Sequence, residues 1–525
     1  MRIGVDVGGT NTDAVLIDGA DVIAATKQPT SADISTGVAN AIRAILSGAS
    51  VPADQVSSVT IGTTHFTNAL VERDRLDNVA VMRLASPSGE ALPPMAGWPT
   101  ALAEKIGRHF FLLPGGYEVD GREISAFNEE KVGAAAIACR DAGINAIAIS
   151  SAFAPLNAAM EEQAARVVQI AHPKASITLS HRIGRLGLIE RENSAILNAA
   201  LTSLARRVVT SFVRALKDLG LTAPLYISQN DGTLVSAEYA AAHPVMTIGS
   251  GPTNSMRGAA FLTGVANAVV MDVGGTTCDI GGVRTNFRMP DVLAIGLGGG
   301  TRIHLDAAQF NAKSLASHNL RVGPDSVGYR LLEESYLFGG KTLTASDVAV
   351  ASGHASFGDS SRLPRLSSAT LDMVWTAFRA ILEQGVDSMK TSASDVAIIA
   401  VGGGSFLIED NLKGAAQVLR PPHASVANAI GAAIAQVGAQ VEQIVDYDVV
   451  PRETALARLR EAVKARVVAT GGALETVEVI DVDEVYLSYL PGRSAQVRVK
   501  AVGDLAYAPQ TPAKTARASR VRHAH

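Results

Sequence analysis

The sequence contains little of what marks several common classes of protein. Its 525 residues include only two cysteines, Cys139 and Cys278, which are too few for a disulfide framework and too far apart for a zinc knuckle. Charged residues make up 18%, below the roughly 25% that is usual. Hydrophobic residues make up 47%, enough for substantial cores. We therefore expect a folded chain of several domains.

The charges and the apolar segments exclude further classes. A formal charge of −4, with no basic stripe in the body of the chain, argues against a nucleic-acid partner. The longest apolar stretches, such as 426–437, are shorter than the ~20 residues needed to span a membrane. Residues 1–7 lead directly into a strand pattern, so we expect no secretory signal. Together these features predict a cytoplasmic protein that contacts neither nucleic acid nor membrane.

One eight-residue pattern occurs twice. Residues 6–13 read DVGGTNTD, and residues 272–279, which lie 266 positions further along, read DVGGTTCD, with six of eight positions identical. In both copies an apolar, strand-like segment precedes the pattern and another follows it. Each copy therefore predicts a β-hairpin with a Gly-Gly-Thr turn. One such turn is often only a turn, but the repetition favours a shared function.

Paired glycines at a turn suit phosphate binding. Without Cβ atoms the backbone can adopt positive φ and present successive N–H groups to an anion. An aspartate beside phosphates would repel them unless a divalent cation lies between, so Asp6 and Asp272 are the predicted Mg²⁺ residues, holding it mainly through water. The predicted phosphate-binding residues are Gly8, Gly9, Thr10, Asn11, Gly274, Gly275, Thr276 and Thr277.

A third glycine turn follows a buried strand pattern at 396–401. Gly402, Gly403 and Gly404 would leave bare backbone against which an adenosine lies. Residues 427–435 then predict a helix of small residues that can pack closely, as expected where two domains pivot.

In this order, the two hairpins, the glycine turn and the small-residue helix resemble the phosphate, adenosine and connecting-helix motifs of the actin, Hsp70 and sugar-kinase superfold. The resemblance implies an α/β fold with two ribonuclease-H-like (actin-like ATPase) domains, and ATP with Mg²⁺ in the cleft between them. The expected division is an N-terminal lobe at 1–265, a second lobe at 266–440, a small C-terminal α/β appendage at 441–508 and a disordered tail at 509–525.

The intervening segments are more specific. Residues 61–73, 191–199, 228–232, 250–252, 298–301 and 320–326 resemble the A-type (HyuA-like) subunit of the hydantoinase/oxoprolinase family. The resemblance implies ATP-dependent ring opening of a cyclic amide or imide, such as a hydantoin, 5-oxoproline or a lactam, by phosphorylation of the carbonyl oxygen. It also implies a B-type hydantoinase subunit as partner, or a homo-oligomer. The family more often has Ala-Gly-Gly after Ser-Gly-Pro, whereas this chain has Thr253, Asn254 and Ser255.

The residues suggest roles but leave alternatives open. Asp13 and Asp279 either orient substrate or water, or fix their hairpins. Thr63, Thr64 and Asn68 are the candidate substrate contacts, and the alternative for Thr63 and Asn68 is that they only cap the helix that follows. The pair His304 and Asp306 is a weak metal candidate because no third ligand is spaced to join it. A small-molecule kinase and a non-enzymatic nucleotide switch remain alternative functions.

Overall fold

The computed structural model describes residues 1–9, 11–30, 33–265, 267–274, 292–293, 295–305, 320–487 and 492–506. Within them, a mixed sheet of nine strands runs through the molecule in the order β17-β18-β16-β10-β9-β4-β1-β2-β3. Its strands are β1 Arg2–Val7, β2 Asn11–Asp18, β3 Asp21–Pro29, β4 Ser58–Thr63, β9 Leu225–Ser228, β10 Leu234–Ser236, β16 Val437–Asp446, β17 Glu478–Tyr486 and β18 Ser494–Gly503.

The first predicted hairpin is confirmed. The apolar run of β1 is buried and pairs with β2 in antiparallel register. On its other side β1 pairs with β4 in parallel, and β4 pairs in parallel with β9. Because carboxyl ends of parallel strands meet at one edge, the first glycine turn, the residues after Thr63 and the loop after Ser228 share that edge.

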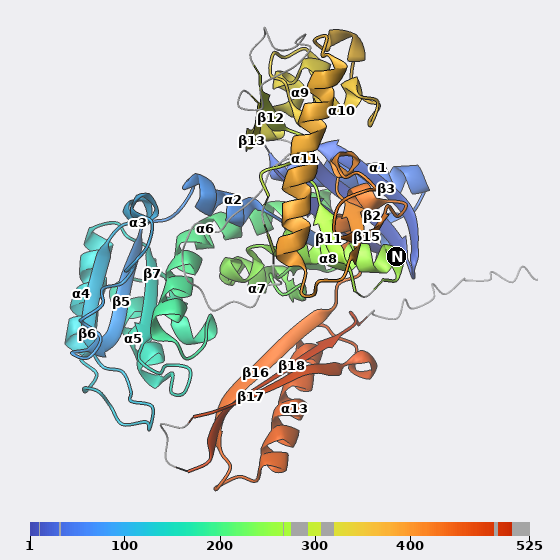
Figure 1. Ribbon diagram of the computed structural model, residues 1–525. Helices are drawn as coiled ribbons and strands as arrows, with labels where there is room; N and C mark the ends of the chain where they lie inside the picture. Colours follow the sequence, from blue (N-terminus) through green and yellow to red (C-terminus); the bar gives the residue numbers. More distant parts are fainter. Residues whose placement is uncertain are drawn as a thin grey trace, which may run out of the picture.

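Three smaller sheets complete the strand framework of the described residues. A parallel sheet, β6-β5-β7-β8, stands at the left of Figure 1 with α4 and α5 beside it. A second parallel sheet, β11-β14-β15, carries the second aspartate, and β12 pairs with β13. The bounds are β5 Val79–Ser86, β6 His109–Pro114, β7 Ala146–Ser151, β8 Ser176–Leu179, β11 Val269–Asp272, β12 Thr301–His304, β13 Arg321–Ser326, β14 Val396–Val401 and β15 Ala415–Leu419.

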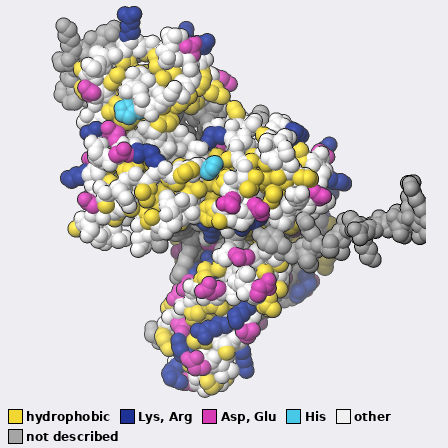
Figure 2. Space-filling view, turned by 90° about the vertical axis from the view of Figure 1, so that its right-hand side faces the viewer, with side chains coloured by type: hydrophobic (Ala, Val, Ile, Leu, Met, Phe, Trp, Pro, Cys, Tyr) yellow, Lys and Arg dark blue, Asp and Glu magenta, His cyan; other side chains and the backbone are white. Residues whose placement is uncertain are grey.

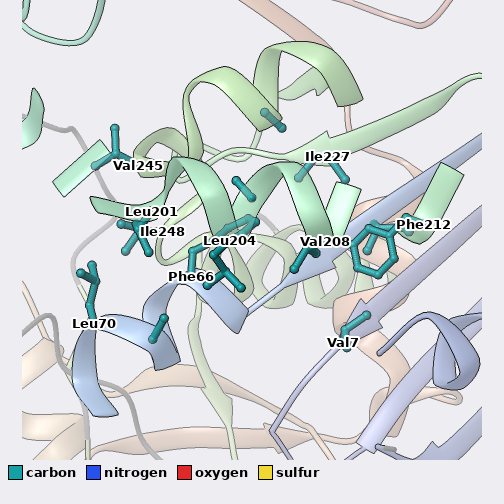
Figure 3. Close-up of a cluster of buried hydrophobic side chains, with 14 of the residues drawn as sticks. Val7, Phe66, Leu70, Leu201, Leu204, Val208, Phe212, Ile227, Val245 and Ile248 are labelled. Atoms are coloured by element: carbon teal, nitrogen blue, oxygen red, sulfur yellow. The ribbon is translucent and has the colours of Figure 1, made fainter. Parts of the chain in front are cut away.

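The long helix α6, Leu188–Asp218, packs across the N-terminal sheets. In Figure 3 Leu204 and Val208 of α6 lie in one cluster with Phe66, which belongs to the helix after β4. The other helices are α1 Ile34–Ala49, α2 His65–Glu72, α3 Thr100–Ile106, α4 Glu129–Asp141, α5 Ala159–Ala171, α7 Ala237–Ala242, α8 Ser250–Thr263, α9 Leu331–Glu334, α10 Ala345–Ala351, α11 Ser368–Met389, α12 Ala427–Ala433 and α13 Arg452–Ala469.

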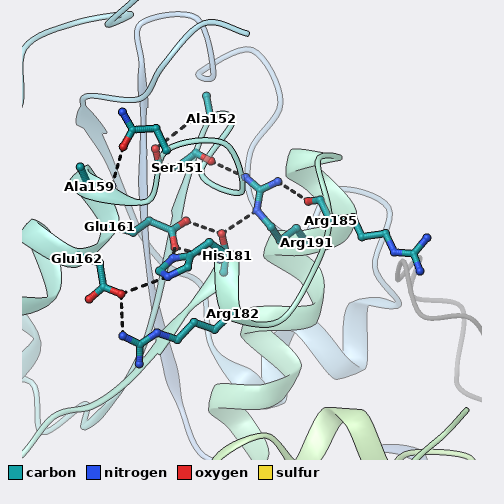
Figure 4. Close-up of polar contacts among 11 residues, drawn as sticks. Ser151, Ala152, Ala159, Glu161, Glu162, His181, Arg182, Arg185 and Arg191 are labelled. Carbon is teal, nitrogen blue, oxygen red and sulfur yellow. Dashed lines mark hydrogen bonds and ion pairs between the residues drawn. The ribbon is translucent and has the colours of Figure 1, made fainter. Parts of the chain in front are cut away.

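The polar start of α6 is a structural anchor. The buried Arg191 guanidinium donates to the Ser151, Arg185 and Leu186 carbonyls, and its Nε donates to Ser180 Oγ at 2.9 Å (Figure 4). These bonds satisfy a charge that would be costly to bury unpaired, and they join α6 to the β6-β5-β7-β8 sheet. Arg191 of the 191–199 motif thus anchors α6 to the ends of β7 and β8.

Helices α8 and α12 contact each other through backbone. A Cβ at Gly431 would lie 1.9 Å from the Asn254 carbonyl oxygen, and one at Gly258 would lie 2.0 Å from that of Ala427. A Cβ at Gly4 of β1 would likewise lie 2.0 Å from the Ala429 carbonyl oxygen. The predicted small-residue helix is therefore present as α12. Because its side chains are small, its backbone can pack directly against the backbones of β1 and α8.

The C-terminal part extends the nine-stranded sheet downward in Figure 1, with α13 packed on β16 and β18 around their own apolar cluster. Figure 2 shows basic and acidic side chains interspersed over this lower part. Arg493 and Asp448, 2.8 Å apart, form one ion pair of the C-terminal part.

Candidate functional site at the ends of the parallel strands

The first glycine turn lies at the exposed end of the β1-β2 hairpin. The Gly8 N–H donates to the Asn11 carbonyl at 3.0 Å, and the Thr30 hydroxyl donates to the Gly8 carbonyl at 2.9 Å. A Cβ on Gly8 would lie only 3.1 Å from the Asn11 carbonyl oxygen, so the tight turn favours glycine. Gly9 beside it is exposed. Thr10, predicted to bind phosphate with them, lies outside the described residues.

The segment predicted to contact substrate lies beside this turn. The Thr64 N–H and hydroxyl both donate to the Val7 carbonyl, each at 3.2 Å, and so tie the start of α2 to the end of β1. Thr64 is the N-cap residue of α2, and its side chain makes no capping bond. The Asn68 side chain makes no hydrogen bond with the described residues. The Thr63 hydroxyl oxygen accepts the N–H of His65, the first residue of α2, at 3.2 Å, so the capping alternative holds for Thr63. Asn68 lies within α2 and does not cap its start.

His65 follows the same strand end. Its Nδ1 lies 2.7 Å from Thr63 Oγ1, and its backbone N–H donates to that oxygen at 3.2 Å. Burial, with a smaller contribution from the Arg75 charge, lowers the pKa of His65 to about 4. The ring is therefore neutral near pH 7 and is held by Thr63.

The second aspartate and the third glycine turn lie at the ends of neighbouring parallel strands. Asp272 of β11 is opposite Val401 of β14. Gly402 has φ +85°, and a Cβ there would lie 2.4 Å from Asp272 Oδ1, so only glycine fits without displacing the carboxylate. The Gly404 N–H donates to the Val273 carbonyl at 2.7 Å. The structure thus brings the Asp272 end and the Gly402 turn together. Gly275, Thr276, Thr277 and Asp279 lie outside the described residues, as does Cys278.

The charges of four side chains affect one another where the two motifs meet: the carboxylates of Asp6, Asp13 and Asp272 and the ammonium group of Lys27. Burial, followed by the charges of Asp13 and Asp272, raises the pKa of Asp6 to about 7. Burial also raises the pKa of Asp13, against the lowering effect of Lys27. Lys27 donates to both Asp13 carboxylate oxygens, at 2.7 and 2.6 Å, and its Nζ lies 3.8 Å from where a Cβ at Gly403 would stand. The hairpin and the third glycine turn therefore face each other.

Three polar residues at this site were not predicted from the sequence: Lys27, Ser255 and Asn428. Ser255 Oγ lies 2.5 Å from Asp272 Oδ2 and also contacts Asn428 Oδ1. Asn428 Nδ2 lies 3.4 Å from Asp6 Oδ2. A signal for Ser255 was present, because it stands in the triplet that departs from the usual Ala-Gly-Gly. Lys27 is opposite Asp13 in a strand pair, a register that a single sequence does not specify.

The residues present fit a hard divalent cation. Asp6 Oδ1 is buried and has no hydrogen-bond partner among the described residues. The described residues contain no group of three His, Cys, Asp or Glu side chains that would hold a metal on their own. Carboxylate oxygens from Asp6 and Asp272, with other positions left to water and phosphate, match the way proteins hold Mg²⁺.

Two other features lie away from this edge. His304 Nε2 contacts Asp325 Oδ1 at 2.8 Å and Arg321, while its proposed partner Asp306 lies outside the described residues. A cavity of about 1330 Å³ lies between the β6-β5-β7-β8 side of the molecule and the C-terminal part, and none of the described residues of the two aspartate-glycine motifs lines it. Among the described residues, no helix is both long and apolar enough to cross a membrane.

Comparison with known proteins gives consistent matches. The model of the hydantoinase/oxoprolinase N-terminal region matches residues 2–171, and the hydantoinase/oxoprolinase model matches residues 191–356. Caprolactamase subunit alpha of Pseudomonas jessenii is 27% identical over 414 residues, which cover 71% of this chain and 58% of that protein. The acetophenone carboxylase gamma subunit of Aromatoleum aromaticum is 25% identical over 403 residues, covering 67% and 53%. The chain thus spans little more than half the length of these curated relatives.

The fold agrees with these matches. The crystal structure of ATP-dependent caprolactamase from Pseudomonas jessenii superimposes with a TM-score of 0.74, covering 96% of this chain and 88% of that one, at 21% identity. The predicted actin-like ATPase type of α/β fold is therefore confirmed. On the matches to both models, the chain belongs to the hydantoinase/oxoprolinase family.

Proposed function

We propose that the protein opens a cyclic amide or imide, such as a hydantoin, 5-oxoproline or a lactam, in a reaction coupled to ATP hydrolysis. The observation that carries the proposal is the meeting of Asp6, Asp13, Lys27 and Asp272 beside two glycine turns that lie far apart in sequence. Membership of the family and the likeness to an ATP-dependent caprolactamase support the same activity.

In this proposal the glycine turns hold the nucleotide. Asp6 and Asp272 face Mg²⁺, which supplies charge neutralisation for phosphoryl transfer. Lys27 adds a positive charge between the hairpin and Gly403. The β- and γ-phosphates lie against Gly8, Gly9, Thr10, Asn11, Gly274, Gly275, Thr276 and Thr277, and the adenosine against Gly402, Gly403 and Gly404.

ATP solves the problem that an unstrained cyclic amide resists hydrolysis. The substrate carbonyl oxygen attacks the γ-phosphorus and ADP leaves, so the ring carbon becomes electrophilic. Water adds to that carbon, the C–N bond breaks as the nitrogen gains a proton, and an acyl phosphate forms. A second water releases the carboxylate and inorganic phosphate. The protein mainly positions these groups and stabilises the charge.

Thr63, Thr64 and Asn68 are the proposed substrate contacts, because their neutral hydrogen-bonding groups stand beside the first glycine turn. Asp13 and Asp279 remain the proposed orienting carboxylates. For Asp13 the bonds to Lys27 suggest that it acts by holding the ammonium group in place.

The proposal extends to organisation and partners. Both relatives described above are named as subunits, which supports a role as the ATP-binding subunit of an enzyme with a B-type hydantoinase partner. We divide the chain into lobes at 1–265 and 266–440, an appendage at 441–508 and a tail at 509–525. Separate apolar clusters around α6, α11 and α13 support the first three units. The tail lies outside the described residues.

The test is ring-dependent release of phosphate. The protein, alone and with a B-type subunit, is incubated with Mg²⁺, ATP and 5-oxoproline, hydantoin or caprolactam, and inorganic phosphate and ring-opened product are measured. Release that requires the ring, and that Asp272→Ala abolishes, supports the proposal. A stable phosphorylated product would instead identify a kinase. ATP binding that no ring compound accelerates, even with the partner, would favour a nucleotide switch.

A further inference from the structure

Ser255 has more acceptors than its hydroxyl can serve. Its Oγ lies 2.5 Å from Asp272 Oδ2 and 3.1 Å from the Gly251 carbonyl oxygen, and it also contacts Asn428 Oδ1. A serine hydroxyl donates one proton, so it bonds one of these three acceptors fully at any moment. Ser255 is 1% exposed, so bulk water does not supply the missing donors. The Ser255 hydroxyl can therefore donate its proton to either of two side-chain oxygens, Asp272 Oδ2 or Asn428 Oδ1.

Asn428 continues the connection toward the first motif. Its Oδ1 faces Ser255, and its Nδ2 lies 3.4 Å from Asp6 Oδ2. The other oxygen of Asp6, Oδ1, is buried without a partner among the described residues. A continuous path of side chains thus runs from Asp272 through Ser255 and Asn428 to Asp6. We name these four residues the aspartate bridge.

The elements that carry the aspartate bridge are held rigidly. Ser255 is on α8 and Asn428 on α12, and these helices touch through backbone at Gly258 and Gly431. Gly4 brings α12 equally close to β1, two residues before Asp6. With so little space between the backbones, a change at one end of the bridge cannot be absorbed by sliding of the helices.

We propose that Ser255 and Asn428 are positioning residues that couple Asp272 to Asp6, so that a cation and nucleotide held at one aspartate also orient the other. This inference rests on the proposed function. When a cation neutralises Asp272, the Ser255 hydroxyl turns to Asn428 Oδ1. The Asn428 amide is then fixed with its N–H group toward Asp6, and the carboxylate is ready to complete the site.

Coupling of this kind is measured by how much Mg²⁺ strengthens ATP binding. The dissociation constant of ATP is determined by calorimetry with and without Mg²⁺ for the full chain and for Ser255→Ala, Asn428→Ala and the double variant. Thermal unfolding of each variant reports a purely structural effect separately. Ser388→Ala is the control, because that exposed hydroxyl donates to the carbonyl four residues earlier, Gln384, at 2.8 Å, and belongs to neither motif.

The expected result is that each single variant reduces the Mg²⁺-dependent gain in ATP affinity about tenfold, and that the double variant reduces it no further. If the reductions in the Mg²⁺-dependent gain from the two single variants add in the double variant, the two residues act independently, and the proposed coupling is overturned. A gain that stays at the wild-type value, even with lowered thermal stability, also overturns it. Wild-type protein that binds no ATP would reject the proposed function itself, and the bridge with it.

Discussion

Lys27 and Asp13 form an ion pair in which the Lys27 Nζ contacts both carboxylate oxygens, at 2.7 and 2.6 Å. The two residues are opposite each other in the β2-β3 pair. The pair directs the ammonium group toward Gly403, across from the hairpin. These two bonds use two of the three ammonium N–H groups, so one remains to donate to a phosphate oxygen.

Replacing Lys27 tests this arrangement. Lys27→Met removes the positive charge and leaves the carboxylates beside the phosphates, so we expect a loss of about 100-fold in ATP-dependent turnover. Phosphate release and ATP affinity are measured together. Lys105→Met, at an exposed position on α3, is the control and should behave as wild type. Equal turnover in both variants would remove Lys27 from the site.

Replacing Asp6 should separate stability from function. Asp6→Asn relieves both the burial of a charge and the repulsion from Asp13 and Asp272, which together raise the pKa of Asp6 to about 7. We expect the nucleotide-free variant to gain on the order of 1–3 kcal/mol in free energy of unfolding. It should also lose most of its Mg²⁺-dependent ATP affinity. Urea unfolding with and without Mg²⁺ and ATP measures both the stability and the ligand-dependent gain in stability. A nucleotide-free variant less stable than wild type would contradict the view that the buried Asp6 charge destabilises the fold.

Gly402 is required for two separable reasons. Gly402→Ala imposes an alanine at φ +85° and places its Cβ 2.4 Å from Asp272 Oδ1. Gly353→Ala imposes a similar φ, +77°, but its Cβ meets nothing within 4 Å. Both variants should lose roughly 1–3 kcal/mol of stability from backbone strain. Calorimetry should find weakened ATP binding in Gly402→Ala alone, and equal affinities would show that the contact with Asp272 has no role.

His65 makes stability depend on pH. Burial lowers its pKa from the ordinary 6.5 to about 4, so between these values the unfolded chain binds a proton that the folded chain does not. The free energy of unfolding should therefore fall on acidification through this window, by roughly 1–3 kcal/mol from this group. Denaturant midpoints at pH 7.5 and 5 measure the change. His65→Gln should show a smaller change, and an unaltered one would contradict this account.

Local pattern was sufficient for much of the fold. The first hairpin, the strand at 396–401 and the small-residue helix all occur near their predicted positions. These elements follow from apolar periodicity and glycine content, which act over a few residues. The repeated aspartate-glycine pattern likewise indicated Asp6 and Asp272 as members of one site, and pKa effects between them agree with that proximity.

The partners of those aspartates did not follow from the same reasoning. Asn428 and Asp6 are 422 residues apart, and Ser255 and Asn428 are 173 apart. Lys27 is closer in sequence to Asp13, but their contact depends on the register of β2 against β3. A sequence pattern carries no information on which distant side chains a helix crossing will bring into contact.

The sequence by itself determined that the chain is an α/β protein and which family it resembles, and it predicted that two aspartate-glycine motifs serve one site. Only the tertiary structure decided that Lys27 pairs with Asp13 and that Ser255 and Asn428 stand between Asp272 and Asp6. The physical reason is the close approach of α12 to β1 and α8, which glycines permit but which packing of the whole chain orients.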